Sequence, residues 1–257
     1  MFKFTKSLFF FGALTACTAG HDIKVQPPSV ENQSEFSELS DLAQPISDPL
    51  IVGVYSFTDQ TGQRAVLSRN TSEMSSAIPQ GLNAILVQEL KLAGEGGWYR
   101  VVERETISDV LNERRIVASA LGAEAEQQLP NLLLPGIILT GGAVSYDRKI
   151  HEEFRGFGIS SVNGNTQVQS DQVGVVLRAV SVQTGEVIET VYASKEVLSQ
   201  VNSLSGLRVF NTSTLAFEVG NATNEPVSLA VRQAIASAIV ELTRRGIKRE
   251  WWSVAPT

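Results

Sequence analysis

Residues 156–175, GFGISSVNGNTQVQSDQVGV, constrain the fold more than any other stretch of this chain. From 162 to 169, small or apolar residues alternate with amide side chains, and no proline interrupts the run. Strict alternation predicts an extended strand with two unlike faces. The denser apolar run after Gln172 indicates that the same strand then enters a different environment. We interpret the VNGN segment, 162–165, as the turn of a hairpin or as its end at a membrane interface.

Two segments of this character, 147–170 and 195–221, are inserted in an otherwise globular pattern. Each is long enough to run out and back as two strands of about ten residues, the length that a barrel strand needs to cross a bilayer. If they cross, one apolar face of each segment meets lipid, and the candidates are Val162, Thr166, Val168, Leu215, Phe217 and Val219. Two long surface hairpins of a soluble sheet fit the pattern equally well, because the barrel signal is weak in each segment.

The N-terminus has the features of a secretion signal that ends in a lipidation site. Lys3 and Lys6 precede a short apolar run that ends in LTAC, with the single cysteine of the chain, Cys17, at the expected cleavage point. Residues 1–16 are therefore predicted to be a signal peptide, and Cys17 is predicted to carry covalent lipid. A triacylated cysteine anchors a protein stably, and Thr18 replaces the aspartate that usually retains lipoproteins in the inner membrane. This favours the outer membrane. An ordinary signal with an incidental cysteine is the alternative.

Residues 17–48 are polar, contain several prolines and show no periodicity, which predicts a flexible tether between lipid and fold. The folded domain is predicted to comprise 49–146, 171–194 and 222–250. Its predicted strands are 50–57, 98–103, 136–146 and a β-hairpin, 172–197, with Gly185 in the turn. The predicted fold class is α+β, a sheet flanked by helices, with two hairpin inserts that form a transmembrane β-barrel on oligomerisation.

Three helices are predicted around this sheet, over 78–93, 105–119 and 225–246. Pro79 and Pro226 stand near the start of the first and the last, and Gly246 is placed at the end of the last. Each helix has an apolar stripe for the core. The predicted core positions are Leu82, Ile85, Leu86 and Leu90; then Ile107, Val110 and Leu111; then Leu229, Ala230, Ile235, Ile239 and Leu242.

Residues that catalysis or metal binding would require are sparse. The chain has two histidines, His21 in the tether and His151 in the first inserted segment, and its cysteine is assigned to lipid. A histidine-based triad or a His/Cys metal site in the folded domain would depend on His151 alone. The GEGG run, 94–97, follows a helix and lacks the lysine of a phosphate loop, so it is interpreted as a turn. We expect no enzyme activity, no metal and no cofactor beyond the covalent lipid.

The chain is acidic, with a net charge of −6. Its basic residues form short clusters such as Arg244 and Arg245 rather than a continuous stripe. Nucleic acid is therefore not expected as a partner.

Five motifs stand in a fixed order along the chain. They are VYSFTDQTGQ (54–63), AIPQ (77–80), LNERRI (111–116), TGE (184–186) and NATNEPV (221–227). Together with the lipidation site they resemble the CsgG-like family of curli secretion lipoproteins. The resemblance covers nearly the whole chain after the tether, and the combination is more specific than any one motif.

The resemblance implies an outer-membrane lipoprotein whose main domain lies in the periplasm. Subunits of the family each contribute two β-hairpins to a shared barrel, closed as a nonamer, through which unfolded curli subunits reach the cell surface without nucleotide. Curli accessory factors are implied as further partners. The alternative function is a periplasm-facing outer-membrane lipoprotein that scaffolds an envelope machine without forming a pore.

In the family, the loop between TGQ and PQ narrows the channel with a tyrosine and an Asn-Phe pair. The corresponding segment here, 64–77, contains no aromatic residue. Leu67 stands where the tyrosine is expected, and Glu73 and Met74 stand where the Asn-Phe pair is expected. The candidates for the pore constriction are Leu67, Arg69, Asn70, Glu73 and Met74. Rings of Arg69 and Glu73 would tune ion selectivity, whereas a loop that merely packs against its neighbour is the alternative.

Family members often continue well past the last helix, and this sequence ends there in WWSVAPT, 251–257. Trp251 and Trp252 are interpreted as aromatic residues of a subunit interface or a membrane surface.

Overall fold

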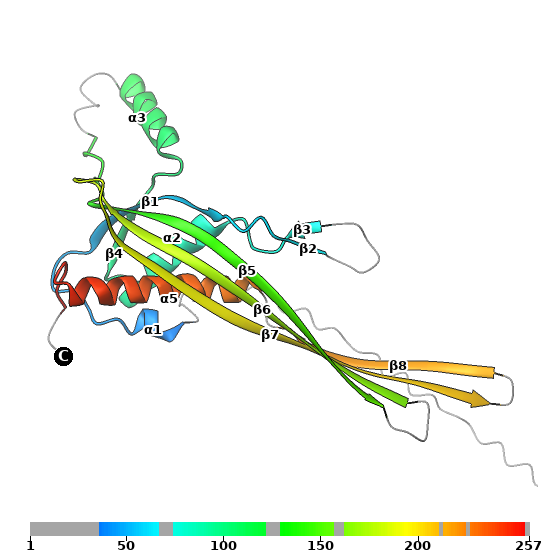
Figure 1. Cartoon of the computed structure of the whole chain (residues 1–257). Coiled ribbons are helices and arrows are strands. Elements are labelled where there is room, and N and C mark those ends of the chain that lie inside the picture. The colour runs from blue at the N-terminus through cyan, green and yellow to red at the C-terminus, as the bar shows by residue number, and fades with distance from the viewer. Residues whose placement is uncertain are drawn as a thin grey trace, which may run out of the picture. The chain divides into compact units, whose positions relative to one another are not determined.

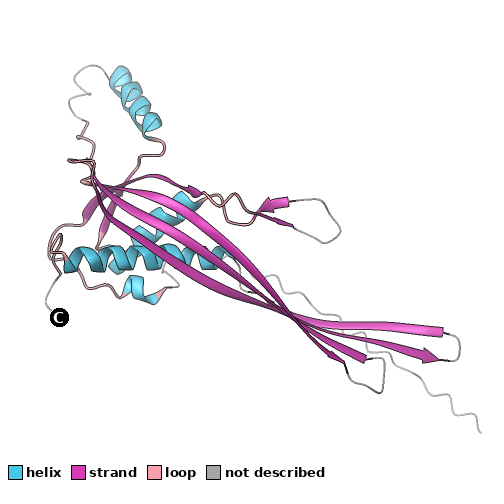
Figure 2. Cartoon of the chain, viewed as in Figure 1, coloured by secondary structure: helices cyan, strands magenta, loops and turns pink. Residues whose placement is uncertain are grey.

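The computed structural model describes residues 36–66, 74–121, 129–156, 162–210, 213–224 and 227–254. By its internal contacts the chain divides into residues 1–31 and 32–257, and every described residue belongs to the second unit. Figure 1 labels the elements of this unit, and Figure 2 colours them by type.

Within the described residues the main sheet has six strands in the order β4-β1-β5-β6-β7-β8. Strand β1 runs parallel to both β4 and β5, and the other neighbouring pairs are antiparallel. The strands are β1 (Leu50–Asp59), β4 (Tyr99–Val102), β5 (Ile137–Gly156), β6 (Val162–Ser181), β7 (Val187–Phe210) and β8 (Ser213–Asn224). A mixed sheet accompanied by helices confirms the α+β class.

The helices are α1 (Ser37–Ser40), α2 (Leu82–Leu92), α3 (Ile107–Leu121) and α5 (Val227–Lys248), with a 3₁₀ turn, η1 (Ala93–Gly96). A separate two-stranded sheet pairs β2 (Arg64–Val66) with β3 (Met74–Ser76). It lies in the chain between β1 and α2.

Helices α2 and α5 pack on one face of the main sheet and form the core with it (Figure 1). On β6, Val173, Val175 and Leu177 stand at alternate positions and are fully buried. The buried residues of α5 recur every three or four positions, as a helix that rests on a sheet requires. They include Ala230, Val231, Ala234, Ile235, Ala238, Ile239 and Leu242. Burial of each large aliphatic side chain contributes roughly 1.5–3 kcal/mol.

Helix α2 begins later than predicted. Its first residue is Leu82 rather than Ile78, although Leu82, Leu86 and Leu90 are fully buried as predicted. Ile78 is buried as well, as a core residue ahead of the helix. Pro79 therefore precedes the helix instead of standing in its first turn. The GEGG run forms the turn that was predicted, and it lies mostly in η1.

The prediction that Gly246 ends the last helix is wrong. Helix α5 continues to Lys248, and Gly246 is a packing position inside it. A Cβ atom added at Gly246 would lie 1.8 Å from Cζ2 of Trp252, so the indole ring occupies the space of a missing side chain. Glycine is used here for close approach rather than for its conformational freedom.

Trp252 belongs to the core and not to a membrane surface. It is 7% exposed, and its Nε1 donates a hydrogen bond to the Thr243 carbonyl oxygen at 2.9 Å. Its ring meets that of Trp98 edge to face, with centroids 6.3 Å apart. Trp251 is partly exposed, with the Arg249 guanidinium over its ring at 5.1 Å.

The predicted tether, 17–48, is too long at its C-terminal end. Residues 36–48 belong to the fold: Leu39 of α1 is fully buried, and Trp98 Nε1 donates to the Ala43 carbonyl oxygen at 2.9 Å. The sequence pattern missed this segment because a four-residue helix is shorter than the window in which periodicity is visible. The rest of the predicted tether and the signal peptide lie outside the described residues.

The turn between β6 and β7 is the one that the sequence predicts. Gly185 adopts a φ of 72°, and its amide donates to the Ser181 carbonyl oxygen at 2.9 Å. The interpretation of VNGN, 162–165, as a turn is wrong, because these residues are the first four of β6. Residues 163–165 pair with both β5 and β7, and Val162 pairs with β7. Their place at the start of β6 agrees with the other interpretation, in which they form an end of the hairpin. Their small and amide side chains masked a strand whose register is set by its neighbours.

Helix α3 is more exposed than predicted. Leu111 is 40% exposed, while Ile107 and Val110 are half-buried. The predicted apolar stripe therefore points only partly into the domain. Figure 1 shows α3 standing away from α2 and α5.

Candidate functional site

The segment with the predicted constriction residues forms a small hairpin. Strands β2 and β3 pair Arg64 with Ser76 and Val66 with Met74. Met74 is thus the first residue of β3. Of the other candidates, Leu67, Arg69, Asn70 and Glu73 lie outside the described residues.

The motif DQTGQ, 59–63, turns the chain from β1 into this hairpin. Asp59 Oδ1 accepts hydrogen bonds from the Thr61 amide at 2.9 Å and from the Thr61 hydroxyl at 2.7 Å. The Thr61 hydroxyl oxygen in turn accepts from the Gln63 amide at 3.2 Å. An aspartate that accepts from the amide two residues on is an Asx turn, for which Asp and Asn are the suited residues.

A second motif, Gly141-Gly142 on β5, lets β1 and β6 each come close to the backbone of β5. A Cβ atom on Gly142 would lie 1.9 Å from the Thr58 carbonyl oxygen, and one on Gly141 would lie 2.0 Å from the Val176 carbonyl oxygen. The φ angles of 145° and 151° also favour glycine. The end of β1, and with it the start of the hairpin, is therefore seated directly on β5.

Beyond the helices, strands β5 to β8 continue as an antiparallel sheet (Figure 2). Val162, Gly206 and Phe217 are partners across β6, β7 and β8. Gly164, Leu204 and Val219 form another such row. Paired positions lie on the same face of a sheet. The register thus brings the predicted lipid-facing sets of β6 and β8 to one face.

Three further candidates share that face with acidic, basic or histidine positions. Thr166 is paired with Glu153, and Val168 is paired with His151. Leu215 is paired with Arg208 near the end of β8. His151 is thus a strand position on β5. Sequence reasoning could not place these partners, because the register between strands is not visible in one sequence.

Where β5 and β6 leave the helix-covered core, a buried acid meets an arginine. Arg148 Nε donates to Asp171 Oδ1 at 2.8 Å, and the Asp171 side chain is 4% exposed. Arg148 Nη2 also donates to the Tyr146 hydroxyl oxygen at 2.6 Å. Burial raises the pKa of Tyr146, and the charge of Asp171 acts in the same direction. Ser170 donates to the Glu196 carboxylate beside this cluster.

We interpret the cluster as a structural ion pair between β5 and β6 rather than a catalytic pair, since the acid is engaged by a permanently charged guanidinium. Nothing in the sequence singles out Arg148 and Asp171. They are 23 residues apart and become neighbours only through the β5–β6 register.

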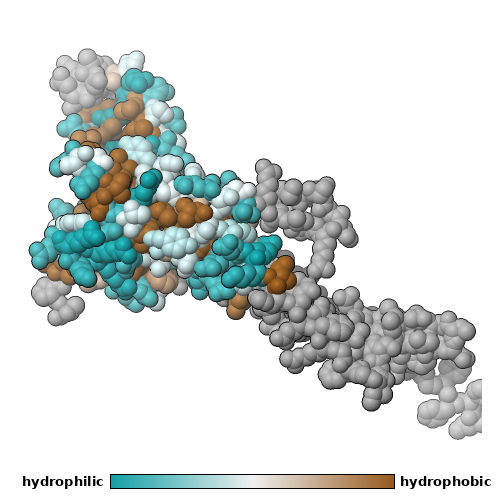
Figure 3. Space-filling model, viewed as in Figure 1, coloured by the Kyte–Doolittle hydropathy of each residue, from teal (hydrophilic) through white to brown (hydrophobic). Residues whose placement is uncertain are grey.

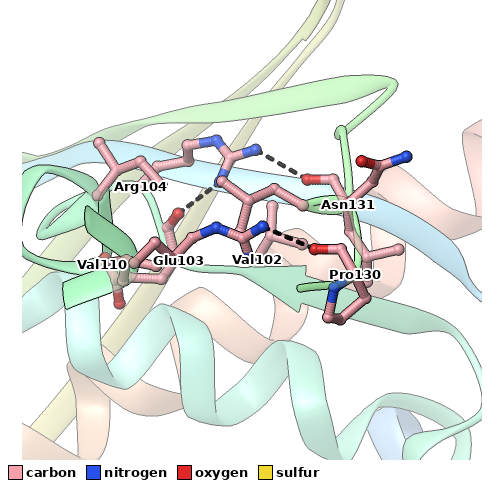
Figure 4. A pocket seen from close by; sticks show the side chains of 10 residues that line it. Val102, Glu103, Arg104, Val110, Pro130 and Asn131 are labelled. Atoms are coloured by element: carbon pink, nitrogen blue, oxygen red, sulfur yellow. Dashed lines mark hydrogen bonds between the residues drawn. The ribbon is translucent and has the colours of Figure 1, made fainter. Parts of the chain in front are cut away.

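A cavity of about 300 Å³ lies at the base of α3 (Figure 4). Its walls come from the end of β4, the first turns of α3 and the returning segment 130–133. Arg104 Nη2 donates to the Leu133 carbonyl oxygen at 3.0 Å, and Arg114 Nη2 donates to the Pro130 carbonyl oxygen at 2.8 Å. The first bond ties the returning segment to the link between β4 and α3, and the second ties it to α3 itself.

Exposed apolar side chains gather near this cavity. Figure 3 shows apolar surface over α3 and over the neighbouring ends of the strands. Exposed large apolar side chains on these elements are Leu111 and Ile116 of α3, Leu133 and Leu134 of the returning segment, and Val182 and Val187 beside the β6–β7 turn. Leu134 is 79% exposed. An apolar surface of this kind is typical of a protein contact.

Among the described residues, no cluster of three or more His, Cys, Asp or Glu side chains could hold a metal ion. In the part of the chain that the structure describes, no helix is both long and apolar enough to span a membrane. The predicted lipidation site, Cys17, lies outside that part.

Comparison with solved structures finds a dodecameric variant of PelC from Paraburkholderia phytofirmans. It is 12% identical in sequence, with 78% of this chain and 93% of that chain covered, and the TM-score is 0.32. A likeness at this level supports no conclusion about function.

Sequence comparison is more decisive. Residues 32–257 match the model of the family described as "Curli production assembly/transport component CsgG". Proteins of that name from Escherichia coli K12, Citrobacter koseri and Salmonella typhimurium are each 30% identical over 248 residues. The alignments cover 94% of this chain and 87% of each relative. The family is described by transport and assembly rather than by a reaction. The chain belongs to the CsgG family of curli production assembly/transport components.

Proposed function

We propose that this protein assembles into an oligomeric, nucleotide-independent secretion channel in the outer membrane, which exports unfolded curli-type subunits. Family membership over residues 32–257 is the observation that carries the proposal. Cleavage after residue 16 and acylation of Cys17 would anchor each subunit, and the main domain would face the periplasm. The proposed assembly is the nonamer, with curli accessory factors as further partners.

The arrangement of strand edges supports assembly through the sheet. Within the described residues, β5 beyond Ala143 is paired with β6 alone, and β8 is paired with β7 alone. We call the part of strands β5 to β8 that lies beyond Ala143 of β5 the outer sheet. One copy therefore has β5 at one edge of its outer sheet and β8 at the other edge. Unpaired edges of this kind template pairing with another chain, and head-to-tail pairing of identical copies generates a ring. Such a ring is a barrel to which segments 147–170 and 195–221 contribute.

The strand register supports a lipid face near the tips of these strands. The rows Val162–Gly206–Phe217 and Gly164–Leu204–Val219 contain small or apolar residues, whereas the intervening row Asn163–Ser205–Glu218 is polar. We assign the first two rows to lipid and the intervening row to the lumen, together with Leu215 on the lipid side. Thr166 and Val168 mark the periplasmic boundary of the apolar band, because their rows contain Glu153 and His151.

The constriction is assigned to the β2–β3 hairpin. Leu67, Arg69, Asn70, Glu73 and Met74 are the proposed lining residues. Without aromatic residues, the opening would be set by charge and aliphatic bulk.

Planar-bilayer recording of the lipidated full-length protein, extracted as an oligomer in detergent, tests the proposal. Discrete ion conductance is expected, since a wet lumen that passes an unfolded chain also passes ions. Oligomers that reach the bilayer and give no conductance would contradict the channel and favour the envelope scaffold. The Cys17→Ala variant controls for anchoring: it should reach the outer membrane far less, as measured by fractionation of whole cells.

A further inference from the structure

We infer that Asp59 and Gln60 are positioning residues that fix the direction in which the β2–β3 hairpin leaves the main sheet. The inference deepens the proposed channel function and rests on it for one of its two readouts. The other readout, amide exchange in the hairpin stem, does not depend on a channel.

Gln60 attaches the start of the hairpin to β5 by two bonds. Its backbone amide donates to the Ala143 carbonyl oxygen at 2.9 Å, and its side-chain Nε2 donates to the Gly141 carbonyl oxygen at 3.1 Å. Two bonds from one residue to two carbonyls on one strand fix both its place and its orientation. The side-chain bond is possible because Gly141 and Gly142 bring β1 close to β5.

Asp59 organises the turn that follows. Its Oδ1 accepts hydrogen bonds from the Thr61 amide and hydroxyl. The Thr61 hydroxyl oxygen in turn accepts a hydrogen bond from the Gln63 amide. Gly62, with a φ of 63°, completes the bend. The chain is therefore held by hydrogen bonds at Asp59, Gln60, Thr61 and Gln63.

The returning leg of the hairpin is tied to the same turn. The Ala77 amide donates to the Gln63 carbonyl oxygen at 3.0 Å, which extends the β2–β3 ladder by one rung. Gln80 Nε2 reaches Asp59 Oδ2 at 3.4 Å, a weaker contact. Next to Ala77, the fully buried Ile78 anchors this leg in the core. Both legs thus converge on Asp59 and Gln60.

The consequence is a fixed relation between the hairpin and β5. Strand β5 continues without a break from Ile137 to Gly156, so the strand that holds the hairpin is also the edge strand of the outer sheet. In a ring, every copy would then present its hairpin at the same angle to the barrel wall. A uniform opening requires the same hairpin angle in every subunit, because one hairpin at a different angle would change the cross-section of the channel.

Hydrogen–deuterium exchange of the full-length protein in detergent tests the inference, with peptides that cover residues 62–80. Asp59→Ala and Gln60→Ala should each accelerate exchange in these peptides by roughly three- to tenfold, as expected for the loss of one or two net hydrogen bonds. Asp59→Asn should instead keep the wild-type exchange rate, because the Oδ1 atom of asparagine also accepts a hydrogen bond in an Asx turn. Gln60→Glu should not restore it, because a carboxylate cannot donate to the Gly141 carbonyl.

Bilayer recording supplies the second readout. Asp59→Ala and Gln60→Ala should broaden the distribution of single-channel conductance, while Asp59→Asn keeps it narrow. Asp48→Ala and Gln183→Ala are matched controls at exposed positions away from the hairpin, and both should behave as wild type. If wild-type protein forms no channels, the channel proposal fails, and the exchange experiment still decides the inference.

Wild-type exchange of residues 62–80 in both alanine variants would overturn the inference. So would equal effects of Asp59→Ala and Asp59→Asn, since these would indicate a general need for the carboxylate. A variant whose exchange rises throughout the chain has lost its fold. In that case the comparison of Asp59→Asn with wild type decides. Wild-type exchange of residues 62–80 in Asp59→Asn supports the inference, and faster exchange there contradicts it.

Discussion

Glu89 on α2 and Arg232 on α5 form an ion pair inside the helix layer, with Nη2 2.9 Å from Oε1 and the Glu89 side chain 1% exposed. Nε of the same arginine lies 3.2 Å from that oxygen. The two helices that cover the sheet are therefore joined by charge as well as by apolar packing.

Glu89→Ala should lower the free energy of unfolding by about 3 kcal/mol, because it removes the carboxylate that compensates a largely buried guanidinium. Urea titration monitored by circular dichroism measures the change. The control is Glu38→Ala, since Glu38 and Arg244 form a pair whose side chains are more than half exposed. Its effect should stay below about 1 kcal/mol. Equal losses in both variants would show that the buried pair adds nothing beyond an exposed one.

The buried Tyr99 should make the free energy of unfolding depend on pH in the alkaline range. Burial raises the pKa of Tyr99 to about 12, while its hydrogen bond with Thr243 acts in the opposite direction. The folded protein keeps a proton that the unfolded chain releases near pH 10, so this contribution is complete below pH 10 and is lost as the pH rises towards 12. Wild type should lose roughly 2–3 kcal/mol relative to Tyr99→Phe across this window. Chemical denaturation at several pH values measures it, and parallel pH profiles would contradict it.

Gly246→Ala should destabilise the protein although alanine favours helices. The added methyl would displace the Trp252 ring, and overpacking of this kind costs about 1–3 kcal/mol. A lower melting temperature with altered tryptophan fluorescence is the expected result. Gly136→Ala is the control, since a Cβ there meets no atom within 4 Å. An unchanged melting temperature for Gly246→Ala would mean that the indole ring moves aside freely.

The sequence predicts this fold well where a signal is local. Alternation in 162–169 predicts a strand, and Gly185 predicts the turn between β6 and β7, because both depend on a few adjacent residues. The sequence pattern misplaces Gly246, because a glycine inside a helix and a glycine that ends a helix look alike until the packing partner, Trp252, is known. Leu39 was missed because α1 is too short to show a period.

The candidate site divides in the same way. The hairpin was located by its flanking motifs, yet the role of Gln60 depends on Gly141, 81 residues away. Likewise, Arg148 and Asp171 meet through the register of two strands. Contacts of this range are set by the packing of the whole sheet, and no pattern in a single sequence specifies them.

Phe217→Arg tests the assignment of a lipid face. An arginine on the lipid side of a barrel strand costs about 2–4 kcal/mol at the membrane midplane, so fewer oligomers should be recovered from the outer membrane. The control is Ala216→Arg, one residue away and on the opposite face of β8. It should assemble nearly as well as wild type. Similar recovery of both variants would refute the proposed orientation.

Glu73→Gln tests the proposed constriction. Each subunit of the ring would lose one negative charge, so the preference for cations over anions should fall. The reversal potential under a salt gradient measures this preference in bilayers. Glu186→Gln, in the exposed turn between β6 and β7, should leave the reversal potential unchanged. An unchanged value for Glu73→Gln as well would place the narrowest part of the channel elsewhere.

Strand β6 also has a mechanical consequence. It is hydrogen-bonded to a neighbour on each side along nearly its whole length, and its pairing with β7 shifts register only between Ala179 and Val180. Twenty extended residues form a stiff lever arm roughly 65 Å long, with α5 packed over one end. A tilt of about 5° at the helix end therefore displaces the far end by roughly 6 Å over that length. A contact that tilts the helix-covered domain therefore also moves the far ends of the strands, and a contact at those ends also tilts the domain.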